Sequence, residues 1–504
     1  MKNILLSLCA ALALQQAAAQ PAPRKPVAIH IDPAVTYQAI HNFAASDAWA
    51  CQFAGNWPDE KRNQMADWLF STDTTATGAP RGIGLSMWRF NIGAGSAKQG
   101  DSSGIKDEWR RAASFLDEDA ISRERQAGQL WFLEAAKKRG VPYFLAFLNS
   151  PPVQLTVNGK AFATKGNCNL SPGKYAALSD YVAEVIPVIQ SRSGVMFDHF
   201  SPANEPQWDW SDGGQEGCPY NNDEISGLVK KLSETFTAKK LDAKILVAEA
   251  GKINYLYETH DKPGKGEQIK AFFSKGSPNY LGGLPNVRHS IAGHSYFTTS
   301  PASPAVAMRR QLAASVASVP GLDFWQSEYC ILGDNGGEIN GEGKDLGMKA
   351  ALYLARVIHH DLTIANATAW QYWLAVSPYN YKDGLVYIDK NKTDGQVQDS
   401  KMLWVLGNYS RFIRPGAKRI QASADSAQGL LVSAYRNTDN SINIVIVNND
   451  PAAVDITLNF SHAKPEQLRS YTTAEDSSLQ PGRPHSNRKA VIPGRSVVTL
   501  VGKM

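Results

Sequence analysis

Between residues 41 and 414, short apolar runs alternate with segments whose apolar residues recur at helical spacing, and this alternation constrains the fold more than any other feature. One such helix, in "RERQAGQLWFLEAAKKRG", stops at Gly140, as helices commonly do. The predicted strands are "IHNFAASDAW", "LSMWRFNI", "VPYFLAFLN", "VMFDHFSPANE", "AKILVAEA", "VRHSIAGHSYF", "LDFWQSEYCIL" and "ATAWQYWLAV". Eight strand–helix repeats are the number that closes a barrel of parallel strands. The sequence therefore predicts an α/β fold, a (β/α)8 TIM barrel, over residues 41–414.

The pattern changes after Pro415, where short alternating strands replace the strand–helix repeats. The runs "GLLVSAYRNTDNSINIVIVNND", "VDITLNF" and "AVIPGRSVVTLVG" are separated by turn residues, which is typical of a β-sandwich, here over 415–504. About 90 residues bury too little apolar surface for a rich core of their own, so we expect this domain to pack on the barrel. The strand-like segment "PVAIHIDPAVTYQAI", within 20–40, is predicted to join its sheet and pin the two chain ends together.

Residues 1–19 have the features of a secretory signal peptide. Lys2 gives a positive start, the apolar run "ILLSLCAALAL" follows, and small residues end the segment near Ala19. This run is shorter than the roughly 20 residues of a transmembrane helix, and Cys9 comes too early for a lipoprotein anchor. We therefore expect a secreted protein, periplasmic or extracellular, that does not insert in a membrane.

Charge and cysteine spacing argue against several kinds of partner. The formal net charge of +5 includes Lys2, so the processed chain carries +4 (5 minus 1), too little and too scattered to indicate nucleic-acid binding. The four remaining cysteines fit no zinc-binding pattern, and disulfides and buried free thiols are equally compatible with them. They are Cys51, Cys168, Cys218 and Cys330. The histidines also lack ligand spacing, so we expect no metal. We separately expect no other cofactor and a monomeric protein.

Two glutamates stand at strand ends where a barrel of this kind carries its chemistry. Glu205, in "HFSPANEPQWDW", follows the fourth predicted strand, and Glu328, in "FWQSEYC", ends the seventh. They are 123 residues apart (328 minus 205), about three strand–helix units, so they can face each other across the mouth of the barrel. A retaining glycosidase needs two carboxyl groups about 5 Å apart in that position. For either glutamate alone, a surface ion pair is the favoured interpretation. The context that the two share, a strand end with Asn or Ser before the glutamate and an aromatic residue nearby, favours the catalytic one.

Several motifs together resemble glycoside hydrolase family 30, of the retaining (β/α)8 clan A. They are "SPANEPQW", "WQSEYC", "FLNSPPVQLTVNG", "GHSYF", "WQYW" and "LGNYSRFIRPGAKRI". The resemblance covers nearly the whole processed chain, and it implies that Glu205 is the acid/base and Glu328 the nucleophile. It also implies that Asn204 hydrogen-bonds the 2-hydroxyl of the attacked sugar.

The same resemblance assigns roles to three other strand-end residues. Arg89, in "WRFNIG", matches the arginine that orients the nucleophile, although an ion pair under the barrel is the alternative. His294 and Tyr296 match groups that bind near the nucleophile. An acid must keep its proton near neutral pH, so the pKa of Glu205 should be raised, whereas Arg89 and tyrosine donors should keep Glu328 ionised.

Loop sequences favour one branch of the family. The run "NSPPVQLTVNG", beginning at Asn149, and "GGQEGC" resemble the branch that cleaves β-1,6-linked galactan of arabinogalactans, and Asn149 is a candidate for substrate binding. A glucuronoxylanase would place a basic pocket on the late loops, where "AVSPYNYKDGLVYIDKNK" has Lys382 but no arginine. The alternatives are a β-1,6-glucanase, another family activity such as an exo-β-glycosidase or xylanase, and, less favoured, a non-catalytic carbohydrate-binding protein.

Aromatic residues complete the expected sugar site, because indole rings stack on sugar faces. The candidates for stacking are Trp49, Trp208, Trp210, Trp325, Trp370 and Trp373, and Trp208 and Trp210 are favoured because they lie in a loop. Trp325 and Trp370 lie within strand runs, where filling the barrel is the commoner role. Glu249, in "LVAEAG", is a third carboxylate at a strand end, for which a bond to a sugar hydroxyl and a buried structural pair are equally plausible.

Overall fold

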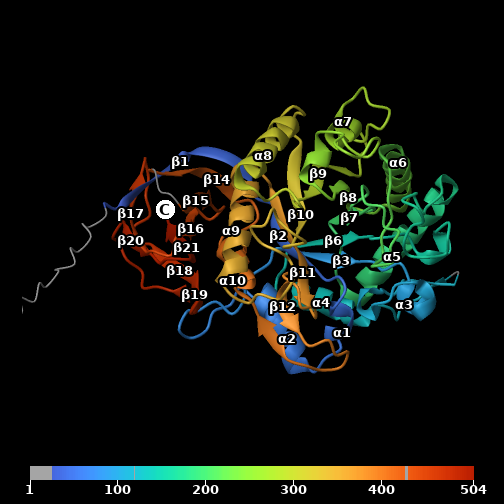
Figure 1. Ribbon diagram of the computed structural model, residues 1–504, viewed down its shortest axis with the longest axis horizontal. Coiled ribbons are helices and arrows are strands. Elements are labelled where there is room, and N and C mark those ends of the chain that lie inside the picture. Colours follow the sequence, from blue (N-terminus) through green and yellow to red (C-terminus); the bar gives the residue numbers. More distant parts are fainter. Residues whose placement is uncertain (1–24, 119, 426–428) are drawn as a thin grey trace, which may run out of the picture.

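Eight parallel strands close into a barrel at the centre of one part of the molecule (Figure 1). In hydrogen-bonding order they are β2 (Asn42–Ser46), β3 (Met87–Asn91), β6 (Tyr143–Phe147), β7 (His199–Ser201), β8 (Lys244–Ala250), β9 (Val287–His294), β10 (Asp323–Tyr329) and β11 (Ala369–Ser377). Strand β11 pairs with both β10 and β2, which closes the ring. The predicted (β/α)8 barrel is confirmed.

Helices follow the strands and cover the outside of the barrel. They are α1 (Cys51–Ala54), α2 (Asp59–Phe70), α3 (Ser96–Gln99), α4 (Ala127–Lys138), α5 (Tyr175–Ser193), α6 (Asn222–Lys239), α7 (Gln268–Phe273), α8 (Ala302–Ala317), α9 (Met348–Thr363) and α10 (Lys401–Ser410). In this computed structural model, residues 25–118, 120–425 and 429–504 are described, so the predicted signal peptide lies outside them. Among the described helices, none is both long and apolar enough to cross a membrane.

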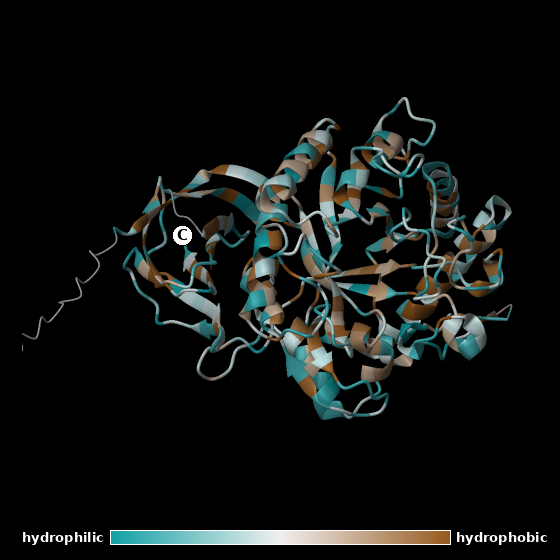
Figure 2. Ribbon diagram, in the orientation of Figure 1, coloured by the Kyte–Doolittle hydropathy of each residue, from teal (hydrophilic) through white to brown (hydrophobic). Residues whose placement is uncertain are grey.

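Apolar side chains fill both faces of the barrel wall. Met87, Leu145 and Trp325 belong to a cluster inside the ring, and the larger core lies between the strands and the helices. Figure 2 shows the resulting pattern: hydrophobic colour along the central strands and hydrophilic colour over much of α2 at the edge. Parallel strands that are buried on both faces need such continuous apolar runs, and these runs are what made the strands predictable from the sequence.

The C-terminal strands form one continuous nine-stranded sheet beside the barrel (Figure 1). Its order is β19 (Ser477–Pro481), β18 (Arg469–Ala474), β21 (Ser496–Lys503), β16 (Ser441–Asn448), β15 (Leu430–Arg436), β14 (Lys418–Ala424), β1 (Val27–Ala39), β17 (Val454–Phe460) and β20 (Lys489–Ile492). Strand β1 runs antiparallel to β14 and parallel to β17, so the N-terminal segment joins this sheet as predicted. The sheet folds over a core to which Ile29, Ile444 and Ile456 contribute from distant strands, which gives the predicted sandwich.

The outer face of this sheet packs on the last two barrel helices. Val445, Val447 and Val497 belong to the same core as α9 and α10. Asn408 of α10 donates to the Tyr471 carbonyl, and its own carbonyl accepts from Thr499 at 2.7 Å. The expectation that the small domain packs on the barrel is therefore confirmed.

The end of strand β7 and the state of the cysteines are two details that the sequence did not fix. Strand β7 ends at Ser201, because Pro202 has no amide hydrogen for the ladder, so Glu205 lies four residues beyond the strand. The four cysteines are free thiols in the structure. Cys51, Cys218 and Cys330 are buried, whereas Cys168 is half-buried and its thiol lies 3.3 Å from the Leu170 carbonyl oxygen.

We expect the N-terminal strand to stabilise the whole chain through its inward side chains. Ile31→Ala should lower the free energy of unfolding by about 2–5 kcal/mol, because Ile31 is 1% exposed and the change leaves a cavity. Val35→Ala, on the same strand but 39% exposed, should change it by less than about 0.5 kcal/mol. Urea denaturation of both variants measures the difference, and equal losses would contradict the role given to β1.

Candidate active site

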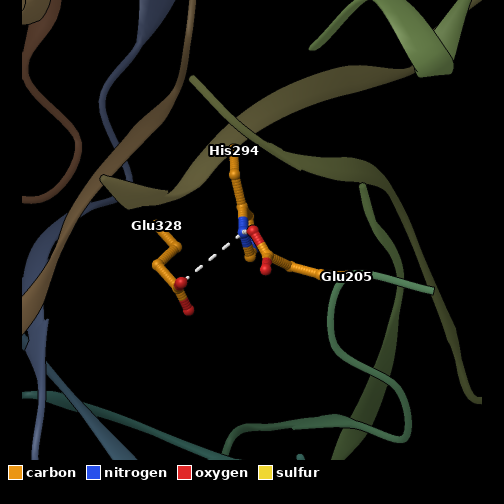
Figure 3. A group of neighbouring side chains, drawn as sticks. All are labelled: Glu205, His294 and Glu328. Atoms are coloured by element: carbon orange, nitrogen blue, oxygen red, sulfur yellow. Dashed lines mark hydrogen bonds and ion pairs between the residues drawn. The ribbon is translucent and has the colours of Figure 1, made fainter. Parts of the chain in front are cut away.

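A cleft of about 550 Å³ opens at the carboxyl end of the barrel strands, and both predicted catalytic glutamates line it. Glu328 is the sixth residue of β10, and Glu205 follows β7 on the other side of the ring. One oxygen of each carboxyl group and a ring nitrogen of His294 lie within 4.8 Å of one another. Figure 3 shows the three side chains converging on one point. The sequence spacing therefore predicted the meeting of the two carboxyl groups.

The carboxylate of Glu328 is held by two donors. Its Oε2 accepts a hydrogen bond from Nη1 of Arg89, and its Oε1 accepts one from the Tyr296 hydroxyl at 3.0 Å. Both donors are buried, so the charge–charge attraction is weakly screened. Arg89 and a tyrosine thus contact Glu328 as the sequence analysis expected.

Arg89 also orients its neighbours through contacts that satisfy its buried charge. Its Nη2 donates to Oδ1 of Asn204 at 2.9 Å, which fixes the orientation of the amide. The guanidinium lies 3.8 Å from the centre of the Phe147 ring. Arg89 is fully buried and reaches the catalytic end of the barrel, so the alternative of an ion pair under the barrel does not apply.

His294, the last residue of β9, lies behind the glutamates and bridges two of them. Its Nδ1 is 2.9 Å from Oε1 of Glu205, and its Nε2 is 3.1 Å from Oε2 of Glu249. Burial opposes the charged imidazolium, but the negative charge of Glu328 and the bonds to Glu205 and Glu249 outweigh burial and raise the pKa of His294 to about 9. A protonated ring with two donor nitrogens matches these two acceptors.

Glu205 is held in an unusual backbone conformation that a sequence pattern does not reveal. Its φ is +46°, in the left-handed region that is costly for a non-glycine residue. Its N–H donates to the Glu249 carbonyl at 2.9 Å, and its own carbonyl accepts from the Trp210 indole at 3.0 Å. These bonds hold the conformation and aim the carboxyl group into the cleft.

Burial raises the pKa of the Glu205 carboxyl. The bond from His294 and its charge act in the opposite direction, and the nearby Glu328 charge adds to the upward shift. The net direction agrees with the expectation for a group that must hold a proton. It also follows the general rule that desolvation favours the neutral form of a carboxylic acid.

Glu249 is a structural partner in this site. Its Oε1 accepts from Ser201 at 2.6 Å, its Oε2 accepts from Ser327, and it does not line the cleft. Burial opposes its ionisation, but the charge of Arg89 and the bonds from His294 and Ser201 prevail and lower its pKa to about 2. Of the two alternatives left by the sequence, the structure supports the buried pair.

The aromatic candidates divide as expected. Four of the six candidates, Trp49, Trp208, Trp210 and Trp373, line the cleft. Trp325 and Trp370 are fully buried within the barrel wall, the commoner role. Asn149 does not line the cleft: it is buried and its amide is 3.5 Å from Oδ1 of Asn91. A direct substrate contact for Asn149 is thus unsupported, because its side chain points toward β3.

Several cleft residues were not found from the sequence. They are Arg110, Gln215, Phe297, Leu332, Tyr379, Tyr381 and Asp383. Tyr379 and Asp383 follow the eighth strand, so the rule that chemistry lies beyond strand ends could have identified them. Arg110 carries no such signal, since it lies far along the loop after β3.

The same three side chains also have the composition of a cation site. Glu205, His294 and Glu328 could each offer one ligand atom. Both ring nitrogens of His294 are, however, already bonded to carboxylates, and Arg89 neutralises Glu328. A metal ion would have to displace these contacts beside a buried cation, so the residues do not fit a metal well.

Two family models match this chain. The model of O-glycosyl hydrolase family 30 matches residues 26–387, and the family 30 beta sandwich domain matches residues 416–500. A curated relative, glucuronoxylanase XynC from Bacillus subtilis, is 29% identical over 157 residues, which are 30% of this chain and 34% of that relative. The match therefore spans about a third of the relative's own length.

Solved structures extend the similarity over the whole chain. A conserved exported protein from Bacteroides fragilis is 32% identical, with a TM-score of 0.87 over 94% of this chain and 100% of that one. Xylanase C of family 30 from Talaromyces cellulolyticus has a TM-score of 0.69 and 22% sequence identity, and the match covers 95% of this chain and 100% of that one. An endo-β1,6-glucanase has a TM-score of 0.66 and 17% sequence identity, and the match covers 96% of both chains. The last two share the fold alone.

We expect His294 to stabilise the fold in a pH-dependent way. Because its pKa is raised from 6.5 to about 9, its contribution is fully present below pH 6.5 and is lost as pH rises through 9. The unfolding free energy lost in His294→Gln should therefore shrink by on the order of 3 kcal/mol between pH 6.5 and pH 10.

His41→Gln is the matched control. Burial lowers the pKa of His41 to about 3, so its contribution should stay flat over the same interval. Urea denaturation of the three proteins at several pH values gives the comparison. A His294→Gln deficit that is constant with pH would show that His294 is neutral.

Proposed function

This chain belongs to glycoside hydrolase family 30, and we propose that it is a secreted, retaining endo-β-1,6-galactanase that cleaves arabinogalactan-type polysaccharides. Membership of the family makes it an O-glycoside hydrolase. The galactan specificity, the retaining outcome, the residue roles and export are the proposed parts.

The observation that supports the retaining outcome is the closeness of Glu205 and Glu328. Their nearest oxygens lie within 4.8 Å. Retaining enzymes have carboxyl groups about 5–5.5 Å apart, whereas inverting enzymes leave roughly 6.5–9.5 Å for a water molecule between them. A separation this short favours direct attack by one carboxylate on the sugar.

In the first step, an oxygen of Glu328 attacks the anomeric carbon and the bond to the leaving oxygen breaks. Glu205 donates its proton to that oxygen, so the leaving sugar departs as an alcohol and the other remains as an ester on Glu328. His294 donates to Oε1 of Glu205, which leaves Oε2 as the atom that carries the proton. The raised pKa of Glu205 keeps this proton available.

In the second step, Glu205 is a carboxylate and accepts a proton from a water molecule. The water oxygen bonds to the anomeric carbon, the ester bond to Glu328 breaks, and Glu205 is reprotonated. Two inversions give net retention. Asn204 is proposed to donate its amide N–H to the 2-hydroxyl, since its Oδ1 is already occupied by Arg89.

The substrate is inferred from the loops and the cleft walls. The segments from Asn149 and "GGQEGC" resemble the galactanase branch, and four tryptophans of the cleft offer faces for galactose rings. Lys382, the first lysine after β11, donates to the carbonyls of Glu342 and Gly343 at 2.6 and 2.8 Å, and the next two, Lys390 and Lys392, are paired with Asp107 and Glu108. Because the Lys382 ammonium is already bound to these carbonyls, it argues against a glucuronate pocket on that loop.

Export is supported by two observations. The first 19 residues have the pattern of a signal peptide. The structure that matches this chain at 32% identity is that of a conserved exported protein. Arabinogalactan is too large to enter a cell intact, so an enzyme that cleaves it within the chain must act outside the cytoplasm.

Product analysis tests the substrate. De-arabinosylated arabinogalactan should yield β-1,6-galacto-oligosaccharides, whereas β-1,6-glucan and glucuronoxylan should be cleaved at least about tenfold less efficiently, the factor that 1.4 kcal/mol of transition-state discrimination gives. Proton NMR of the first product should show the β-anomer before mutarotation. Glucose or xylose oligomers as the main products would refute the galactan specificity while leaving the chemistry intact.

The roles of the two glutamates can be separated by the leaving group. Glu205→Gln should lose about 100- to 10,000-fold on polysaccharide, yet release dinitrophenol from an activated galactobioside in a burst, because that leaving group needs no proton. The glycosyl ester should then accumulate, and peptide mass spectrometry should locate it on Glu328. Glu328→Gln should give no burst, and an adduct on any other residue would refute the assignment.

A further inference from the structure

The loop between β7 and α6 contains the run "GGQEGC", and its last four residues each make a different contact. Gln215 lines the cleft. Glu216 is buried and accepts from the N–H groups of Ala94 and Ser96 at 2.9 and 3.2 Å, so it ties this loop to the connection after β3. The remaining two residues, a glycine and a cysteine, connect the loop to the catalytic acid and to the loop after β6.

Gly217 supports the tryptophan that holds the backbone of the catalytic acid. The Trp210 ring packs so closely on Gly217 that a Cβ there would lie 2.4 Å from Cδ2 of the ring. The same indole donates to the Glu205 carbonyl at 3.0 Å, one of the bonds that keep Glu205 in its left-handed conformation. The placement of Gly217 therefore matters for the aim of the Glu205 carboxyl group.

Cys218, the next residue, lies against the loop after β6 at the position of a second cysteine. Its sulfur accepts from the Asn169 N–H at 3.4 Å, and Asn169 directly follows Cys168 in the chain. The Gly217 N–H donates to the Ala161 carbonyl at 2.8 Å, so the two loops are also joined through their backbones. The Cys218 sulfur thus lies beside the backbone of Cys168, a closeness that a disulfide requires.

The charge properties of the two thiols agree with this placement. Burial opposes the ionisation of Cys218, but the neighbouring Cys168 thiol and the Tyr220 hydroxyl outweigh burial and lower the pKa of the Cys218 thiol. Cys168 is half-buried and follows the exposed Asn167, so a reagent in solution can reach it. Thiol–disulfide exchange needs one accessible thiol and one that ionises readily, and this pair offers both.

The other two cysteines have different surroundings. Cys51 begins α1 and is fully buried, next to the end of the first barrel strand. Cys330 lines the cleft, with its sulfur 3.9 Å from the Tyr296 hydroxyl. Of the two pairings that the four residues could make with Cys218 at one end, only Cys168 has its backbone beside that sulfur.

We propose that Cys168 and Cys218 are a disulfide site, which closes when the chain meets a disulfide oxidant such as oxidised glutathione or a dithiol oxidase. The Cys168 thiolate attacks the disulfide of the oxidant, forms a mixed disulfide and releases one thiolate. The Cys218 thiolate then attacks the Cys168 sulfur and releases the other. The two cysteines lose two protons and two electrons, and both are taken up by the oxidant, which becomes two thiols.

The bond would fix the Gln-Glu-Gly-Cys loop to the loop after β6 and so hold Gly217 under Trp210. It closes a ring of 51 residues (218 minus 168, plus 1), which restrains the unfolded chain and stabilises the folded one. That an oxidant of this class meets the chain rests on the proposed export. The choice of the pair rests only on the contacts around the two sulfurs.

Peptide mapping tests the pair without any substitution. The chain without residues 1–19 is purified in reducing conditions and then equilibrated, folded, in a buffer of reduced and oxidised glutathione. Free thiols are alkylated after unfolding, and trypsin then cleaves between the two cysteines at Lys174 and Arg192. We expect the peptides of Cys168 and Cys218 to be linked, and Cys51 and Cys330 to be alkylated. Alkylation of all four cysteines, or a link between any other two, would overturn the proposal.

Thermal unfolding tests what the bond does to the loop. The oxidised enzyme should melt on the order of 5 °C above the reduced enzyme. Cys168→Ser, at the half-buried position, should abolish this difference between oxidising and reducing buffer, whereas Cys51→Ala, which removes a thiol elsewhere, should keep it. Equal melting temperatures for the linked and the reduced wild type would show that the bond does not fix the loop.

Failure of the proposed export can be told apart from failure of the pair. The full chain with its own leader is recovered from cells and mapped in the same way. If it stays inside the cytoplasm with free thiols while the purified chain forms the link in the glutathione buffer, export is refuted and the pair stands. If it is recovered outside the cytoplasm with Cys168 and Cys218 both free, the pair is refuted and export stands.

Discussion

A buried positive charge at the carboxyl end of the barrel is the constraint on which the site depends. Arg89 is fully enclosed, so every group around it must compensate its charge or accept its hydrogens. Glu328, Asn204 and, at 3.8 Å, Glu249 supply these partners. Three strands and one loop are thereby fixed relative to one another, which holds the reacting groups in place before substrate binds.

Charge balance explains why one glutamate can hold a proton while its neighbours do not. Arg89 and a protonated His294 give two positive charges, and Glu249 and Glu328 give two negative ones. A third carboxylate would be uncompensated in this dry setting, so Glu205 is the group that burial drives toward its neutral form. The difference between the glutamates comes from position, since the residue type is the same.

Much of this arrangement could be predicted from the chain. The eight repeats, the sandwich, the added N-terminal strand and the facing glutamates follow from periodicity and from the rule that strand ends meet at one rim. Asn149 shows the limit, because a loop motif does not tell which way a side chain turns. Glu249 shows another, since its structural role depends on Ser201 and Ser327, which lie on other strands.

The sequence by itself determined the architecture and the carboxylate pair, because local periodicity and strand-end placement can be recognised without knowledge of the packing, and its motifs indicated the family by resemblance. Only the tertiary structure decided the environment of each charge. The left-handed backbone of Glu205, the bridging of two glutamates by His294 and the approach of Arg110 to Tyr379 join segments far apart in the chain. Electrostatic effects depend on distance and burial, and neither quantity exists until the chain has folded.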